Sequence, residues 1–146
     1  MALVQFHMLW VNHPSPDKPC DEEAFTNQCA IRMGVALEKS GVNTRSFDTM
    51  YPNRRCYPGF KHSPRHILAA QELANWIRAT EAIFGKTEIH KKVTSKNFKG
   101  RKGIVFIQNG WDSTDHIDVW NGVAMKGGSP SYFSLGKEVW FWELKV

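Results

Sequence analysis

The sequence contains only three cysteines, and none of them forms a Cys-x-x-Cys pair. It also lacks a close Cys/His cluster with metal-ligand spacing, so we expect no metal site. No apolar run approaches the roughly 18 residues that a membrane-spanning helix needs. Residues 1–14 lack the basic region, long apolar core and small-residue cleavage site of a signal peptide. We therefore expect no transmembrane segment, and any export by a route that needs no signal peptide.

The composition is that of a folded protein. The chain has 146 residues, of which 42% are hydrophobic, with six tryptophans and nine phenylalanines. That excludes an intrinsically disordered chain and suffices for one hydrophobic core. No repeat, low-complexity stretch or linker divides the sequence, so we expect a single domain over residues 1–146.

Positive charge is concentrated in one segment. The formal net charge is +5, and residues 86–102 hold seven Lys or Arg against the single acid Glu88. The segment is either a solvated loop and strand edge or a surface that attracts a polyanion, such as nucleic acid, an anionic membrane or the cell wall. Phe98 is the only aromatic residue within it, whereas stacking platforms for nucleic acid need several rings. We therefore expect no nucleic-acid partner.

Helical signals fill the first half of the chain. Apolar residues recur at helical spacing in residues 3–11, which predicts a short first helix. A second helix is expected to begin near Cys29, with Thr26 or Asn27 as its N-cap. Gly41 suits the left-handed position that ends it. The apolar face of this helix comprises Ala30, Met33, Gly34 and Leu37.

A third helix is predicted after a long connection. Residues 43–62 contain prolines and show little periodicity, which is typical of a loop. Ser63 and Pro64 are a helix cap and a proline at the first helical position, and the helix should extend to about Thr80. Its buried stripe comprises Ile67, Ala70, Ala74 and Ile77.

Strand signals fill the last third of the chain. Residues 104–107, 115–120 and 138–144 have the apolar runs or alternation of strands, and Asn121-Gly122 is a turn signal. Helices come first and antiparallel strands last. This order predicts an α+β fold in which N-terminal helices pack on a C-terminal antiparallel sheet.

Cys29 is expected in the first turn of the second helix, where the helix dipole and the unpaired N–H groups favour an anion. A thiol there, near an imidazolium, can become a thiolate nucleophile. The alternative is a small buried apolar residue, which is the usual state of a helical cysteine.

His116 lies on a predicted strand. The period of two places His116, Asp118 and Trp120 on one face, which we expect to line a cleft, with the aliphatic residues between them facing the core. A thiol on a helix and a histidine on a strand can form a nucleophile and base pair. Asp118 is either part of that site or a solvated strand carboxylate.

Cys20 and Cys56 remain if Cys29 is the reactive thiol. Each lies in a loop that contains proline, so a Cys20–Cys56 disulfide is a hypothesis. It would close a loop of about 35 residues and stabilise the fold by a few kcal/mol. It requires an oxidising compartment.

Several segments together resemble a known family. NQCAIRMGVALEKSG around Cys29, Asn109-Gly110-Trp111, HIDVWNG from His116 and the terminal VWFWEL are similar to the fourth family of type VI secretion amidase effectors. FHMLWVNHP and AAQELANWI fit the same family, so the resemblance covers nearly the whole chain. It implies a papain-like, NlpC-type cysteine peptidase domain that needs no cofactor.

The resemblance also implies an activity and partners. Such an antibacterial effector cuts the bond between D-glutamate and meso-diaminopimelate in peptidoglycan stem peptides. It is made in the producer cytoplasm, passes through the secretion apparatus and acts in the target-cell periplasm, and a cognate immunity protein inhibits it in the producer. Carried over to this chain, Cys29 is the nucleophile and His116 the base. The backbone N–H of Cys29, with the segment around Gln28, is the expected oxyanion donor.

The third catalytic residue stays open. Some relatives carry an aspartate further along the chain, where this sequence has Gly127. Asp118 is the expected substitute, and Asn121 and Asp115 are the alternatives. Only geometry decides such a role.

Substrate contacts are expected from Gln28, Trp111 and Trp120, although both tryptophans suit the core equally well. Arg32 either binds a substrate carboxylate or anchors a loop. Two other functions remain open, a Cys/His acyltransferase and a non-catalytic basic module that binds cell wall or nucleic acid. The mass of the product separates hydrolysis from acyl transfer, and a binding module would not respond to alkylation of Cys29.

Overall fold

The computed structural model describes residues 4–16, 28–52, 54–55, 67–111 and 114–145, and the side chains of 110–114 lie outside that description. Five α-helices and four strands are described, with two 3-10 helices after β1 and before β4. The helices are α1 Phe6–Asn12, α2 Cys29–Lys39, α3 Arg45–Met50, α4 Ala70–Ala79 and α5 Glu81–Phe84, and the 3-10 helices are η1 Ser95–Phe98 and η2 Pro130–Ser134. The strands are β1 Glu88–His90, β2 Gly103–Trp111, β3 Thr114–Trp120 and β4 Glu138–Glu143.

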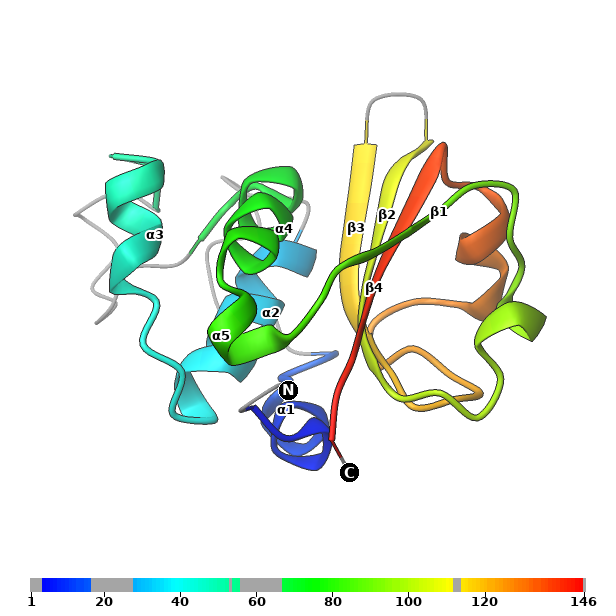
Figure 1. The fold of residues 1–146 in the computed structure, drawn as a ribbon, viewed down its shortest axis with the longest axis horizontal. Coiled ribbons are helices and arrows are strands. Elements are labelled where there is room, and N and C mark those ends of the chain that lie inside the picture. Colours follow the sequence, from blue (N-terminus) through cyan, green and yellow to red (C-terminus); the bar gives the residue numbers. More distant parts are fainter. Residues whose placement is uncertain (1–3, 17–27, 53, 56–66, 112–113, 146) are drawn as a thin grey trace.

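The strands form one antiparallel sheet in the order β1-β4-β2-β3. Strand β3 is therefore at the edge of the sheet, next to β2, and His116 lies opposite Ile107. Helices α2, α4 and α5 cover one face of the sheet, while η1 and η2 lie on the other (Figure 1). The predicted α+β fold, with helices packed on an antiparallel sheet, is confirmed.

Each face of the sheet has its own hydrophobic core. The core on the helical side joins α1, α2 and α4 to alternate residues of the strands, including Ile104, Ile117 and Val119. The core on the other side joins η1 and η2 to the remaining strand residues, including Val105 and Trp120. Because successive strand residues point to opposite faces, β3 contributes to both cores. His116 and Asp118 of β3 are buried as well.

Helix α2 forms as its periodicity predicts. Its apolar stripe is buried, and Gly34 packs next to Ile67. Gly41 has a φ of 87°, the left-handed geometry that ends a helix, as predicted. Gln28 occupies the N-cap position without a capping side-chain bond. The predicted caps, Thr26 and Asn27, lie outside the described residues.

Two sequence predictions about residues 43–80 are wrong. Residues 45–50 form helix α3 within the predicted loop, and α4 begins at Ala70. Ile67 is extended because it pairs with Arg55 in an isolated antiparallel bridge. Buried Arg55 also binds Glu38 at 3.1 Å and Asp48 at 2.8 Å, which ties this segment to α2 and α3. Short helices held by such long-range contacts carry little signal in local sequence.

Candidate active site

The site lies where the N-terminus of α2 meets the edge strand β3. Cys29 is the first residue of α2 and is 6% exposed. Its thiol donates to the carbonyl oxygen of Asp115 at 3.7 Å and is hydrogen-bonded to His116. The sulfur therefore lies at the positive end of a helix and against an imidazole.

His116 links the thiol to a carboxylate. Its ring is 9% exposed, and Nε2 lies 2.8 Å from Oδ2 of Asp118. The ring of Tyr132, from η2, packs on it edge to face with centroids 5.0 Å apart. Gly128 crosses beside the ring, and a Cβ there would lie 2.9 Å from Nε2 of His116 and 2.6 Å from Tyr132. Only glycine fits this approach, so the imidazole is held between Tyr132 and the Gly128 backbone.

Asp118 is fully buried, at 0% exposure. Besides His116, it accepts hydrogen bonds from the backbone N–H of Val119 at 2.8 Å and of Gly127 at 2.9 Å. Burying a polar group such as this side chain is costly unless donors of this kind satisfy its oxygens. Gly127 is the position at which some relatives have an aspartate. In this chain its backbone N–H donates to the carboxylate of Asp118, which β3 supplies.

Opposing effects set the pKa of His116. Burial lowers it, while hydrogen bonds and charge from Asp118 and Cys29 raise it, with the net result that the pKa rises from 6.5 to about 9. The imidazole therefore holds a proton at neutral pH. Its two partners, a carboxylate and a sulfur that can carry negative charge, are the groups that favour an imidazolium.

A second buried histidine faces Asp118 and was missed by the sequence analysis. His13, just after α1, is 4% exposed, and its Nε2 lies 3.5 Å from Oδ1 of Asp118. Burial is the largest effect on the pKa of His13 and lowers it to about 4, so this ring is neutral at pH 7. The sequence around His13 is a proline-containing connection and gives no sign of this contact, because its partner Asp118 lies far along the chain.

The alternative third residues have other partners. Oδ1 of Asp115 accepts the backbone N–H of Asn109, a residue with a φ of 53°, at 2.8 Å. Oδ1 of Asn121 accepts the N–H groups of Val123 and Ala124, which forms the turn after β3. Of the three candidates, Asp118 is the one whose carboxylate meets the ring of His116.

The other residues expected at the site, Trp120, Gln28 and Arg32, have different surroundings. Trp120 is 1% exposed and donates to the carbonyl of Phe98 at 2.9 Å, so the expectation that it lines a cleft is wrong. It faces the second core because that side of the sheet is covered by η1 and η2. Gln28 lies buried immediately before Cys29. Arg32 donates to the carbonyl of Pro16 at 3.2 Å, which favours its loop-anchoring role.

Two predicted features fall outside the described part of the chain. These are the Cys20–Cys56 disulfide and the side chain of Trp111. Within the described residues, no three His, Cys, Asp or Glu side chains are grouped as a metal site would require. Likewise, none of the described helices has the length and apolar character to cross a membrane.

The fold is that of solved type VI secretion effectors. The structure is similar to the type VI effector Tae4 from Enterobacter cloacae, with a TM-score of 0.74 and 18% identity over 99% of this chain and 100% of that one. It also resembles the effector–immunity complexes Tae4-Tai4 from Enterobacter cloacae (TM-score 0.70, 22% identity, 97% and 98% covered) and Salmonella Typhimurium (0.71, 18%, 96% and 97%).

The sequence itself assigns the family. The model described as type VI secretion system (T6SS), amidase effector protein 4 matches residues 25–142. The chain therefore belongs to this family of amidase effectors and is a hydrolase. No curated protein sequence matches it significantly.

Proposed function

We propose that the protein is a cysteine endopeptidase that hydrolyses an amide bond in peptidoglycan stem peptides, with Cys29 as nucleophile, His116 as general base and acid, and Asp118 orienting His116. The observation that carries this proposal is the continuous buried connection from Cys29 through His116 to Asp118 in an amidase effector. Nucleophile, base and orienting group are each within reach of the next.

The first half of the reaction forms a thioester. His116 already holds the proton at neutral pH, and Cys29 attacks the carbonyl carbon of the amide as the thiolate. Nε2 of His116 is bonded to Asp118, so Nδ1 is the ring nitrogen that serves Cys29. The negative oxygen that develops is stabilised by backbone N–H groups at the N-terminus of α2, including that of Cys29. The carbon–nitrogen bond breaks as the imidazolium of His116 protonates the leaving amine.

The second half restores the enzyme. Neutral His116 accepts a proton from water while the water oxygen attacks the thioester carbon. The carbon–sulfur bond breaks, releasing a carboxylic acid, and Cys29 leaves as the thiolate beside the imidazolium. Asp118 stays bonded to Nε2 of His116 throughout and holds the ring in one orientation, as the carboxylate of other nucleophile–base–acid triads does.

We propose that the bond cut is the one between D-glutamate and meso-diaminopimelate. The basis is the family resemblance of the sequence segments around Cys29 and His116. We also propose delivery through the secretion apparatus into the periplasm of a target cell, where this substrate is found. A cognate immunity protein is the expected inhibitor, because the solved relatives include effector–immunity complexes.

The test is digestion of purified sacculi followed by mass analysis of the released fragments. Wild-type protein should release stem-peptide fragments that have gained one water per cut bond. Cys29→Ala and His116→Ala should release none, while His7→Ala, a change at an exposed histidine of α1, should match wild type. Hydrolysis by Cys29→Ala would contradict the mechanism, and an acyl group on an acceptor would indicate an acyltransferase.

A further inference from the structure

The segment after α1 reaches the catalytic carboxylate from the side opposite His116. The backbone N–H of His13 caps α1 by donating to Leu9 at 2.9 Å, and its side chain turns inward to Asp118. Oδ2 of Asp118 faces His116, and Oδ1 faces Nε2 of His13 at 3.5 Å. The carboxylate therefore lies between two imidazoles, one at each oxygen.

The proton on neutral His13 can be placed. Nδ1 of His13 accepts the backbone N–H of Ser15 at 3.3 Å. Nδ1 is consequently unprotonated, and the single ring proton lies on Nε2, the nitrogen that is 3.5 Å from Oδ1 of Asp118. Burial, together with the charges of Arg32, Lys126 and His116, lowers the pKa of His13 against the raising effect of Asp118. His13 thus offers Asp118 an N–H dipole without competing with His116 as a second cation.

Two cationic side chains fix the same segment. Lys126 donates to the carbonyl of Trp10 at 2.8 Å and lies 5.0 Å from the centre of its ring. These contacts join the end of α1 to the loop that contains Lys126. The residue after Lys126 is Gly127, whose backbone N–H donates to Asp118. Arg32, one turn along α2 from Cys29, donates to the carbonyl of Pro16. The segment that carries His13 is therefore tied both to the nucleophile helix and to the Gly127 loop.

We propose that His13 is a positioning residue that fixes the Asp118 carboxylate so that its other oxygen stays aligned with His116. The inference rests on the proposed role of Asp118 in catalysis. A partial rotation of the carboxylate about its Cβ–Cγ bond would turn Oδ2 away from Nε2 of His116 and weaken the bond between them. The Nε2–H dipole of His13, with the N–H groups of Val119 and Gly127, opposes that rotation.

Three variants separate positioning from simple packing. His13→Gln retains an N–H donor near the place of Nε2. His13→Asn can replace the acceptor for Ser15 but is too short to reach Asp118, and His13→Leu fills the space without polar groups. We expect Gln to stay within about threefold of wild-type kcat, and Asn and Leu to lower kcat about tenfold with little change in KM. His7→Leu, at an exposed histidine, is the matched control.

A second readout does not depend on activity. NMR titration of the His116 imidazole reports how firmly Asp118 holds it, because Asp118 raises the pKa of His116. Cys29 and Tyr132, two other titratable residues that contact this ring, are left unchanged by the variants. We expect the pKa of His116 to fall in His13→Asn and His13→Leu and to stay near its wild-type value in His13→Gln.

The outcomes distinguish this inference from the proposed function. If Asn and Leu leave both kcat and the His116 titration unchanged, or if Gln loses as much as Leu, the positioning role is wrong while hydrolysis stands. If no variant, wild type included, hydrolyses sacculi, the proposed function fails, and the NMR titration alone decides whether His13 fixes Asp118. Should His13→Leu fail to fold, the comparison of Asn with Gln carries the test.

Discussion

His116 is the residue on which the proposed chemistry depends. Burial alone would remove its proton at neutral pH, but the carboxylate of Asp118 and the sulfur of Cys29 raise its pKa to about 9. A charged imidazole that is nine-tenths buried is sustained only by such partners. The same partners keep the acid that the leaving amine needs available at neutral pH.

The first prediction concerns pH. The pKa of His116 is raised, so the imidazolium is present below about pH 9 and is lost as the pH rises through that value. We therefore expect kcat/KM on a purified muropeptide to decline on the alkaline side near pH 9. Asp118→Asn should lower the pKa of His116 and shift this decline to lower pH.

The control for this profile is Asp48→Asn, a change on α3 that removes a carboxylate remote from His116. It should leave the alkaline decline where wild type has it. An unshifted decline in Asp118→Asn would show that this carboxylate does not govern His116.

Gly128 supports a second prediction at the residue scale. A methyl group at this position would lie 2.9 Å from Nε2 of His116 and 2.6 Å from Tyr132, so Gly128→Ala should displace the imidazole from Asp118. We expect kcat to fall by roughly 10- to 100-fold, because small misplacements of a catalytic group are costly. Gly127→Ala, whose added methyl approaches nothing closer than 3.4 Å, should lose less. Equal activity in the two variants would contradict the crowding argument.

At the scale of elements, the fold brings α1, α2 and the end of β3 together around one carboxylate. Helix α2 supplies Cys29, β3 supplies His116 and Asp118, and the end of α1 supplies His13. At the C-terminal end of α2, Arg55 binds Glu38 of that helix, Asp48 of α3 and the carbonyl of Thr44. The nucleophile helix is thus fixed by polar contacts at both of its ends.

Arg55 gives a prediction for stability. Arg55→Ala would remove a buried guanidinium together with its bonds to Glu38, Asp48 and Thr44, and should lower the free energy of unfolding by about 2 kcal/mol. The neighbouring Arg54, which pairs with Glu72 at the surface, is the matched control, and Arg54→Ala should change little. Urea unfolding of both variants measures the difference. Equal losses would contradict a structural role for the buried cation.

The sequence predicted the elements that have strong periodicity and missed those made by distant contacts. Helix α2 and strand β3 have regular apolar patterns, and their pairing of Cys29 with His116 followed from the family resemblance. Helix α3 is too short for its local pattern to distinguish it from a loop. The alternation in β3 suggested that Trp120 lines a cleft, because a strand pattern cannot tell an open face from one covered by a second core.

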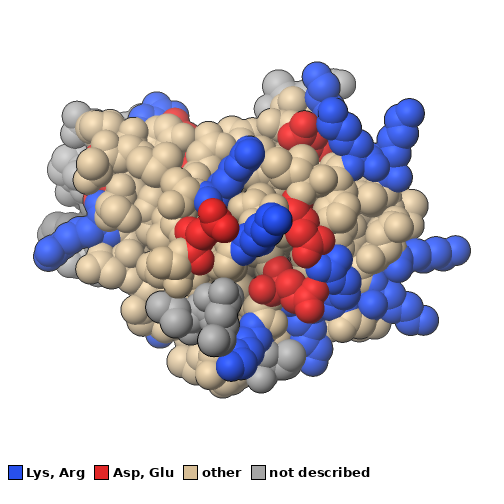
Figure 2. Space-filling view, viewed as in Figure 1, with Lys and Arg blue, Asp and Glu red and all other residues tan. Residues whose placement is uncertain are grey.

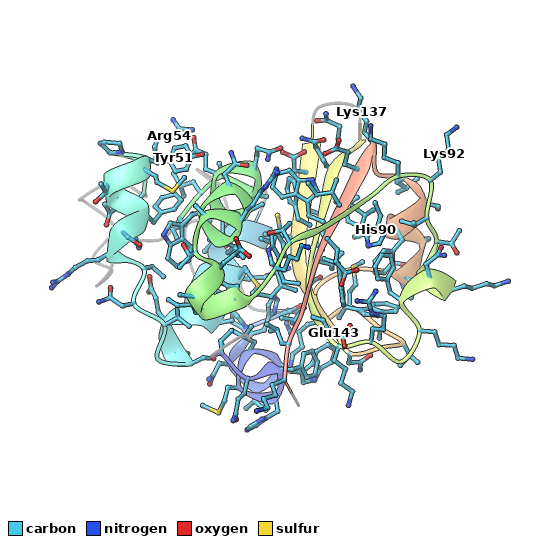
Figure 3. All side chains as sticks on the ribbon, viewed as in Figure 1. Tyr51, Arg54, His90, Lys92, Lys137 and Glu143 are labelled. Atoms are coloured by element: carbon cyan, nitrogen blue, oxygen red, sulfur yellow. The ribbon has the colours of Figure 1, made fainter. Side chains whose placement is uncertain are left out.

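At the scale of the whole molecule, charge is unevenly distributed. Lys and Arg side chains project around the end that carries η1 and η2 (Figure 2). Lys92 and Lys137 extend away from the sheet there, while His90 points inward toward the core beside Phe98 (Figure 3). Arg101 forms ion pairs with Glu88 and Glu143, which offset its charge, so it adds little to the positive electrostatic potential of this end. The lysines of the basic segment thus form an exposed surface that can attract an anionic polymer.

This surface gives a prediction about ionic strength. Raising the salt concentration should slow hydrolysis of intact sacculi more than hydrolysis of a small muropeptide, because screening weakens attraction to an extended polyanion. Replacing Lys92, Lys96 and Lys99 by Gln should reduce that salt dependence. Lys39→Gln, at the end of α2, serves as the control. Equal salt dependence on both substrates would mean that the basic surface does not contribute to substrate encounter.

The most direct test of the central claim is to trap the thioester on Cys29. Wild-type protein mixed with a purified stem-peptide substrate is quenched with acid during turnover, and the intact protein and its peptides are analysed by mass. We predict an adduct with the mass of the acyl fragment, located on the peptide that contains Cys29, and neither adduct nor turnover in Cys29→Ala. Turnover by Cys29→Ala, or an adduct on another residue, would contradict the assignment of Cys29 as the nucleophile.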